Sequence, residues 1–245
     1  DYQVSLVRYF GDGSEECDTS GEARPNIELD DWGLALWAMA DYVERTKDTA
    51  WLGEKNYRGT MYSAARDHVF RTLAACLDRA GDGLVVTRDT GLWEQNDEPY
   101  QLYASSTLAA VAGVRGFAGL ARAAGDAAAA AEAETLVPKL AEGFRRTFVK
   151  NGITMGRADG AARNRIDGAL LNALDFDVVP APDLFGRMEA LVTPSGGYRR
   201  VNGTTDYEAQ EFVFIDVAFA RMLLKKGDRA RAEKMIGRLT GRVAA

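Results

Sequence analysis

The sequence is poor in the residues that most often build metal and nucleophilic sites. It contains two cysteines, Cys17 and Cys76, without a CxxC spacing, and a single histidine, His68. Because zinc sites draw their ligands mainly from Cys and His, this shortage argues against a zinc site of that kind. His68 follows Asp67 and has no Ser or Cys partner at a recognisable spacing, so it is interpreted as a structural or surface residue. We predict no nucleophilic triad, no required metal and no cofactor.

Long apolar runs and basic stripes are also missing. The Ala-rich segment is interrupted by Asp126, Glu132 and Glu134, so no membrane span is predicted and a soluble protein is expected. The net charge is -6 and the pI is near 5.0, which argues against a nucleic-acid partner and favours a neutral or cationic ligand. The chain begins at Asp1 without the apolar centre of a signal peptide, and the sequence leaves localisation and oligomeric state open.

What the sequence does contain is a helical pattern. Hydrophobic residues make up 47% of the 245 residues, enough to bury a core, and the length fits one large domain. Apolar residues recur at steps of three and four almost throughout, which predicts an all-α fold. Thr60, Asp126 and either Asp30 or Asp31 are placed to cap three of the helices. The expected helices are 30–46, 60–79, 104–123, 126–149, 163–174, 182–192, 209–226 and 228–240.

Two connections, 80–103 and 193–208, are long and rich in aromatic and polar residues. By contrast, a single turn joins helices 104–123 and 126–149, which are expected to form an antiparallel hairpin. The short apolar piece Leu84–Thr87 is interpreted as a minor excursion within its loop. In a stack of helical hairpins, long loops gather at one end, so both long connections should face the same way. Without a strict sequence repeat, an α/α toroid or a bundle remains as the fold.

The first long connection places Trp93 directly before Glu94, in the stretch GLWEQNDEPYQLYASS. A Trp beside a carboxylic acid offers an apolar wall that raises the pKa of the acid and a surface on which a sugar ring can stack. The plainer interpretation is a charged side chain on a solvated loop. The local sequence leaves both interpretations open.

The second long connection runs into SGGYRRVNGTTDYEAQE, residues 195–211. Arg200, Tyr207, Glu208 and Glu211 in this segment are the residue types that bind a polyhydroxylated ligand, since rings cover C–H faces and charged groups bind hydroxyls. A charged turn that leads into a helix is the alternative, in which Glu208 and Glu211 complement the helix dipole.

Carboxylates also stand at two expected helix starts. NIELDDWG places Asp30, Asp31 and Trp32 at the start of helix 30–46, and Asp167 opens helix 163–174. Acids at such positions most often cap the helix or complement its dipole. The alternative is that they face a ligand cavity.

Taken together, four segments in this order resemble the catalytic domain of glycoside hydrolase family 15, which includes glucoamylases, glucodextranases and trehalose-cleaving enzymes. IELDDWGLALWAM resembles the helix with a Leu-Asp-aromatic-Gly pattern, and GLWEQND resembles the G-x-W-E segment, followed by the matching helix and Gly-Asp turn SSTLAAVAGVRGFAGLARAAGD. RIDGALLNALDF resembles the D-x-S-L-L helix. GGYRRVNGTTDY resembles the G-G-x-x-R-Y-x-G-D-T-Y-Y loop, with Val201 in place of Tyr.

The resemblance implies an (α/α)6 toroid of six helical hairpins, with a sugar pocket formed by the longer loops. By its position in the motif, Glu94 corresponds to the general acid of an enzyme that cleaves α-linked glucosides with inversion. A second carboxylate must then activate water from the opposite face, roughly 6.5 to 9.5 Å away. About eight of the twelve helices are visible, and the P-E-Q type base segment and the W-P-R-D type sugar-binding segment are absent. We therefore expect an incomplete toroid, either part of a longer domain or a protein that has lost its ends.

The resulting prediction is a glycoside hydrolase whose partner is an oligosaccharide or glucoside. Glu94 is the predicted acid, and the base is either outside the chain or one of Glu208 and Glu211. A non-catalytic carbohydrate-binding or regulatory domain on the same scaffold is the alternative. A sugar epimerase is disfavoured because it would be expected to rely on histidines. The expected substrate-binding residues are Trp93, Trp32, Asp31, Asp167, Arg200 and Tyr207.

Overall fold

The computed structural model describes residues 8–9, 15–16, 27–94, 100–156, 166–178, 184–202 and 209–243. Helices dominate this part of the chain, and the predicted all-α fold is confirmed. The α-helices are α1 (Asp30–Thr46), α2 (Met61–Ala64), α3 (Arg71–Ala75), α4 (Ala104–Ala123), α5 (Ala127–Phe148), α6 (Asn172–Asp175), α7 (Leu184–Met188), α8 (Val213–Lys225) and α9 (Arg229–Val243). The strands pair antiparallel as β1 (Arg8–Tyr9) with β2 (Glu15–Glu16), β3 (Lys55–Asn56) with β4 (Gly59–Thr60), and β5 (Leu77–Ala80) with β6 (Gly83–Val86).

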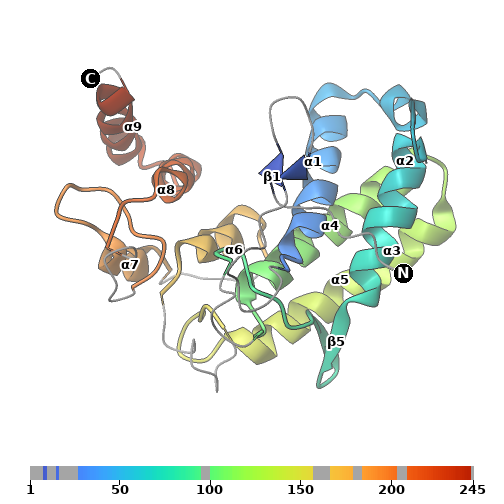
Figure 1. Ribbon diagram of the computed structural model, residues 1–245, viewed down its shortest axis with the longest axis horizontal. Coiled ribbons are helices and arrows are strands. Elements are labelled where there is room, and N and C mark those ends of the chain that lie inside the picture. Colours follow the sequence, from blue (N-terminus) through green and yellow to red (C-terminus); the bar gives the residue numbers. More distant parts are fainter. Residues whose placement is uncertain are drawn as a thin grey trace.

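Three long helices form the body of the fold, with α1 and α5 packed on α4 (Figure 1). Helices α8 and α9 pack against each other at the end of the molecule opposite α2 and α3. The 3-10 helix Gly168–Leu171 contacts both α4 and α8 and so links the two groups. The long connections of the sequence run between these groups.

Helix α4 is the central helix of the core. By length and composition it could cross a membrane, but 83% of its most apolar stretch is buried inside the fold. Leu108 and Ala112 belong to one apolar cluster, which extends to α7 and α8, whereas Val111 and Phe117 belong to another, which extends to α1 and α3. Because α4 is covered on both faces by the protein itself, it is a core helix of this fold.

Two glycines set the separation between α1 and α4. A Cβ added to Gly33 of α1 would lie 2.4 Å from both the carbonyl carbon and the carbonyl oxygen of Ala109. A Cβ added to Gly113 of α4 would lie 2.3 Å from the carbonyl oxygen of Gly33. The two backbones therefore touch directly at the crossing, an approach that any side chain would prevent.

Gly33→Ala is accordingly expected to lower the free energy of unfolding by about 3 kcal/mol, because the new methyl group forces the two packed helices apart. Gly119→Ala, in α4, is the matched control, since nothing lies within 4 Å of a Cβ at that position. It is expected to stabilise the protein by about 0.5 to 1 kcal/mol through helix propensity. Urea unfolding of both variants measures the difference, and equal effects would contradict the crossing.

Several sequence predictions are confirmed at the level of single residues. Helices 30–46 and 104–123 match α1 and α4, and α5 occupies 127–148 of the predicted 126–149. Asp126 caps α5 by accepting a hydrogen bond from the backbone N–H of Ala129 at 3.0 Å. Thr60 caps α2 in a reciprocal capping box with Ser63.

The predicted helix 60–79 is wrong at its carboxyl end. The helix stops at Ala75 after a π-helical stretch over Ala65–Phe70, and the chain continues as strand β5. Leu84–Thr87, interpreted as a minor excursion, contains most of the partner strand β6, with Leu77 opposite Val86. Gly81 has a φ of 65° at the hairpin turn. The apolar spacing of this segment fits either structure, and the cross-strand pairing decides between them.

The predicted helix 228–240 corresponds to α9, whereas the three predicted helices before it differ from the structure. For 163–174, the described part holds the 3-10 helix Gly168–Leu171 and α6, whereas residues 163–165 lie outside the described residues. For 182–192, α7 continues as a 3-10 helix over Glu189–Leu191. Helix 209–226 starts later, as α8.

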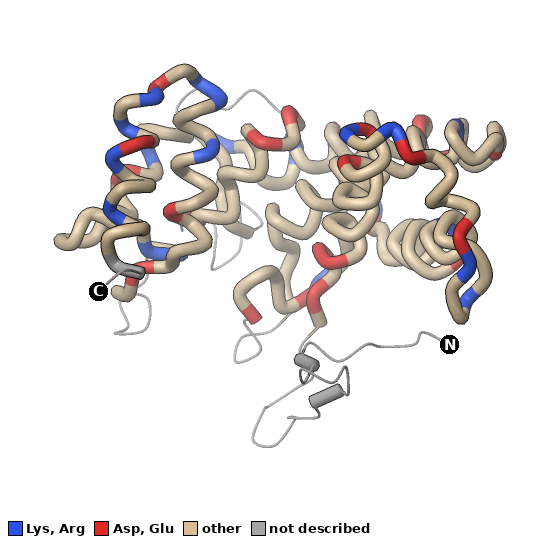
Figure 2. The backbone as a smooth tube through the Cα atoms, turned by 90° about the horizontal axis from the view of Figure 1, so that it is seen from above, with Lys and Arg blue, Asp and Glu red and all other residues tan. Residues whose placement is uncertain are grey.

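Charged residues of both signs occur along the helices (Figure 2). Lys and Arg recur along α9, where Arg229 pairs with Glu233 at 2.7 Å and both side chains are largely exposed. Exposed pairs of this kind contribute little to stability. The ion pair of Arg238 differs, because that side chain is largely buried between α8 and the 193–200 segment.

Candidate active site

The turn Gly91–Glu94 carries the predicted general acid. The backbone N–H of Glu94 donates to the carbonyl of Gly91 at 3.1 Å, which closes the turn. Gly91 has a φ of 66° and Glu94 has a φ of 53°. The left-handed region is uncommon for a residue with a side chain, so the Glu94 backbone is held there by its surroundings. The Glu94 residue itself is exposed, as a proton donor that must reach a ligand requires.

The segment just before α1 forms hydrogen bonds with the start of this turn. The Thr90 N–H donates to the carbonyl of Ile27 at 2.8 Å, and the Ile27 N–H donates to the Thr90 hydroxyl at 3.1 Å. The Asp89 carboxylate accepts hydrogen bonds from the backbone N–H of Leu29 at 3.2 Å, from that of Gly91 at 3.1 Å and from the Ser106 hydroxyl at 2.7 Å. The turn is therefore fastened to the starts of both α1 and α4.

Asp89 is a residue that sequence reasoning missed. It is fully buried, and burial raises its pKa to about 7 even though its hydrogen bonds favour the charged form. In the sequence it stands in the polar stretch after a short apolar segment, which looks like an ordinary surface loop. The contacts of Asp89 come from α1 and α4, far away along the chain, so only the tertiary structure identifies it.

Trp93 is the point at which the distant segments meet. Its indole N–H donates to Asp167 at 2.8 Å, and its backbone carbonyl accepts from the Arg200 guanidinium at 3.4 Å. The guanidinium carbon of Arg200 also lies 5.7 Å from the centre of the Trp93 ring, within the range of a cation–π contact. Phe212 and Phe214, at the start of α8, lie with their ring centres 6.1 and 6.2 Å from that of Trp93. Residues of the two long connections therefore meet at Trp93.

Asp167 plays two roles at this junction. It is 1% exposed, and the oxygen that accepts from Trp93 also accepts from the backbone N–H of Ala169 at 2.8 Å. It therefore caps the 3-10 helix Gly168–Leu171, as the capping interpretation held, and orients the indole of Trp93 as well. This arrangement positions Trp93 beside Glu94 with little freedom to move.

The other predicted site residues are placed less directly. Trp32 is partly buried and packs on the apolar cluster under α1, while Asp31 is exposed at the start of that helix. Tyr207 and Glu208 lie outside the described residues. The structure thus brings Trp93, Glu94, Asp167 and Arg200 together, and it sets Trp32 and Asp31 on α1, the helix to which the turn is fastened.

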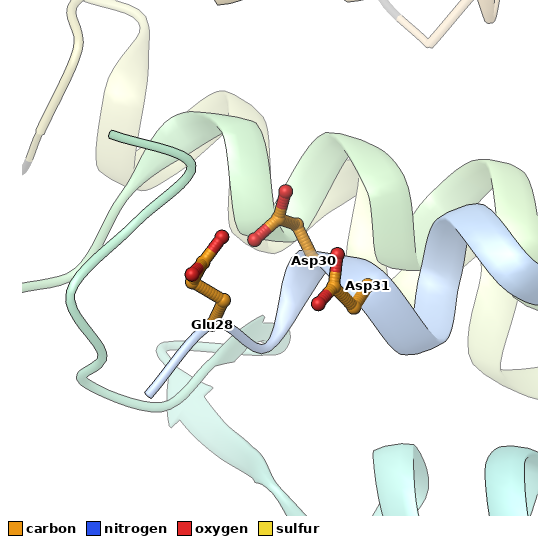
Figure 3. A group of neighbouring side chains, drawn as sticks. All are labelled: Glu28, Asp30 and Asp31. Atoms are coloured by element: carbon orange, nitrogen blue, oxygen red, sulfur yellow. The ribbon is translucent and has the colours of Figure 1, made fainter. Parts of the chain in front are cut away.

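The capping role predicted for Asp30 or Asp31 is wrong. The residue at the N-cap of α1 is Leu29, and it makes no side-chain capping bond. Asp30 is 1% exposed, and its pKa is raised to about 7 by burial and by the neighbouring charges of Asp31 and Asp167. Partial burial of its carboxyl group raises the pKa of Asp31. Figure 3 shows the side chains of Glu28, Asp30 and Asp31 gathered where α1 begins.

Glu211 is tied into the protein by several donors at once. Its Oε1 accepts hydrogen bonds from the Thr193 hydroxyl at 2.9 Å, from the Gly197 N–H at 2.9 Å and from the Ser195 hydroxyl, and Arg238 pairs with both oxygens. Burial opposes ionisation, but these hydrogen bonds and the guanidinium lower the pKa of Glu211 to about 2. A carboxylate held in this way fixes the 193–197 turn.

The stability that Glu211 contributes is expected to depend on pH. Because its folded pKa is depressed, the contribution is present above the unfolded value near 4.5 and is lost as the pH falls toward about 2. Glu211→Gln should therefore destabilise the protein at neutral pH, and the gap from wild type should shrink on acidification. Urea unfolding across this pH range measures it, with the exposed Glu132→Gln as control. A gap that stays constant with pH would contradict the prediction.

The arrangement of the helices is similar to that of solved glycosidases. A wild-type glycosidase matches with a TM-score of 0.66 at 17% sequence identity, over 95% of this chain and 57% of that chain. A glutamate-to-alanine glycosidase variant in complex with glucose matches with a TM-score of 0.68 at 17% identity, with the same coverage. A bacterial glucoamylase complexed with acarbose matches with a TM-score of 0.55 at 14% identity, over 78% of this chain and 29% of that chain.

No family model matches the sequence, and no curated protein sequence matches it. The chain spans 57% of the length of the glycosidases to which it is similar. At such low sequence identity, structural similarity establishes the fold alone. The predicted fold class is thereby confirmed: the chain has the helical toroid fold of these glycosidases, over part of its extent.

Proposed function

We propose that this chain contributes the general acid of a glycoside hydrolase site. The site acts on α-linked glucosides with inversion, as in glycoside hydrolase family 15. The observation that carries the proposal is the junction at Trp93, where the turn with Glu94 meets Asp167 and Arg200. These residues come from three of the segments that resemble the family. A fold shared with glycosidases supports the same assignment.

In this mechanism Glu94 is the general acid that donates a proton to the glycosidic oxygen as the bond breaks. Its exposure allows contact with a bound sugar, and Trp93 beside it supplies an apolar wall. Arg200, whose guanidinium lies over the Trp93 ring, hydrogen-bonds to sugar hydroxyls. Trp32, Asp31 and Tyr207 are further proposed contacts of the substrate.

Inversion also requires a carboxylate that activates water on the opposite face of the sugar, roughly 6.5 to 9.5 Å from the acid. Of the two acids predicted for this role, Glu211 is occupied by Arg238, Thr193, Ser195 and Gly197, which does not favour it as a base. Glu208, or a carboxylate outside these 245 residues, is therefore the proposed base.

Two measurements on the chain test the proposal together. Glucose released from maltose, isomaltose, trehalose and nitrophenyl α-glucoside is quantified, and proton NMR follows which anomer forms first from nitrophenyl α-glucoside, whose leaving group is not a sugar. Tryptophan fluorescence reports sugar binding independently of turnover. We expect release of glucose as the β-anomer from at least one substrate, together with saturable binding.

The possible outcomes separate the candidate functions. Release of α-glucose first from nitrophenyl α-glucoside would overturn inversion, and saturable binding without release from any substrate would overturn hydrolysis. Binding alone would favour the carbohydrate-binding or regulatory domain, which the same scaffold can support. A chain that neither binds sugar nor releases glucose would overturn both candidate functions.

A further inference from the structure

Three carboxyl groups converge where α1 begins, and one of them, Asp31, is also a proposed contact of the substrate. Glu28, Asp30 and Asp31 each offer a carboxylate oxygen, and these oxygens all lie within 4.8 Å of one another. Figure 3 shows the carboxyl groups of Glu28 and Asp30 turned toward each other, with Asp31 beside them on the first turn of α1. Like charges this close repel strongly unless something neutralises them.

Asp30 is the member of this group that protein contacts leave unsatisfied. Its side chain is 1% exposed, and none of the residues that the structure describes donates a hydrogen bond to its Oδ1. Within the described residues, neither Asp30 nor Asp31 forms an ion pair with Lys or Arg. A buried carboxylate oxygen without a donor is unfavourable, and such atoms in folded proteins point to a missing ligand or ion.

Helix capping does not account for this group. The N-cap position of α1 belongs to Leu29, and no side chain accepts a capping hydrogen bond there. Asp89, another buried acid, differs from Asp30 because two backbone N–H groups and a hydroxyl satisfy it. Protein donors therefore satisfy both carboxylate oxygens of Asp89, whereas one oxygen of Asp30 lacks a donor among the described residues.

The chemistry of the group fits a hard divalent cation. Calcium binds carboxylate oxygens at roughly 2.3 to 2.6 Å in irregular geometry, so its ligands can be up to about 5 Å apart. Magnesium requires about 2.0 to 2.1 Å in a near-ideal octahedron, which limits opposite ligands to about 4.2 Å. The three oxygens lie within 4.8 Å of one another, a separation that the longer bonds of calcium span. We propose that Glu28, Asp30 and Asp31 bind a calcium ion at the start of α1, with water completing its coordination.

Such an ion would act on the turn that carries Glu94. The segment 27–29 is hydrogen-bonded to Thr90 and Asp89, so an ion held by Glu28 and Asp30 fixes the backbone that fastens the turn. Calcium binding should therefore stabilise the folded chain whether or not a substrate is cleaved.

Terbium luminescence provides a direct test, because terbium replaces calcium at oxygen sites and the indole of Trp32, next to Asp31 in the sequence, can sensitise it. We expect saturable luminescence that calcium competes away and that magnesium displaces poorly. Asp31→Asn should weaken terbium binding at least about tenfold, and Asp30→Asn should do the same if the variant folds. Asp41→Asn is the control, because Asp41 also lies in α1 but pairs with Arg45 on the surface.

Thermal unfolding gives a second readout that does not depend on enzymatic activity. Calcium at roughly ten times its Kd should raise the Tm of wild type by about 3 to 6 °C, and sodium chloride of equal ionic strength should not. The Asp31→Asn variant should lose this shift. The absence of saturable terbium luminescence, or equal binding by Asp31→Asn and Asp41→Asn, would overturn the site. Failure of hydrolysis alone would leave the binding result standing.

Discussion

Glu94→Gln is expected to lower kcat for hydrolysis of an unactivated α-glucoside by about 10² to 10⁴, with little change in KM. Glutamine has nearly the same shape but has no proton to give to the leaving oxygen. The loss should therefore appear in the chemical step rather than in sugar binding. Initial rates on maltose, together with the fluorescence assay of binding, measure both quantities for the same variant.

The leaving group distinguishes a proton donor from any other role of Glu94. α-Glucosyl fluoride requires much less protonation to depart, so the variant should retain far more of its activity on this substrate than on maltose. Glu54→Gln, at another exposed glutamate, is the control and should behave as wild type. Equal losses on both substrates, or no loss on either, would remove Glu94 from the role of acid.

Arg238→Met is expected to lower the free energy of unfolding by about 3 to 5 kcal/mol, because it leaves a buried charge without its partner. Arg238 donates to Asp216 at 2.5 Å and pairs with Glu211 at 3.1 Å, and Asp216 is fully buried. Asp216 also accepts from the backbone N–H of Tyr198 at 2.7 Å, so its carboxylate connects α8 to the segment that carries Arg200.

A matched substitution on the same helix isolates this effect. Arg229→Met removes the exposed pair with Glu233, and its expected effect is below about 1 kcal/mol. If the uncompensated charge is the cause, Asp216→Asn should recover part of the stability when it is combined with Arg238→Met. Urea unfolding of these variants gives the comparison. A similar loss in the two arginine variants, or no recovery in the double variant, would contradict the assignment.

The sequence predicts the long helices well because their signals are local. In α4, apolar and small residues follow the helical period for its whole length, and Asp126 starts α5 through a bond to a residue three positions away. The β5–β6 hairpin was missed because strand pairing is a relation between segments. The glycine in the Leu-Asp-aromatic-Gly pattern shows the same limit, because only the structure places Gly33 against Ala109.

The same contrast between local signals and tertiary contacts applies to the candidate site. Trp93 and Glu94 could be selected because adjacent residues form a recognisable pattern, and Arg200 and Asp167 because their segments resemble those of a family. Nothing in the sequence distinguishes Asp89 or Asp216 from surface acids, since burial is a property of the completed fold. The prediction that an acid caps α1 was wrong for the same reason: proximity to a helix start does not reveal which backbone position the residue occupies.

The left-handed backbone at Glu94 lowers the stability of the folded chain at the position proposed to carry the general acid. With a φ of 53°, the site would accept glycine or asparagine more readily than glutamate, by roughly 1 kcal/mol. Selection of a random library for thermal resistance alone should therefore discard the glutamate early, while selection for sugar release should retain it. Sequences related to this chain that have abandoned hydrolysis should drift toward small residues at this one position before the surrounding turn changes.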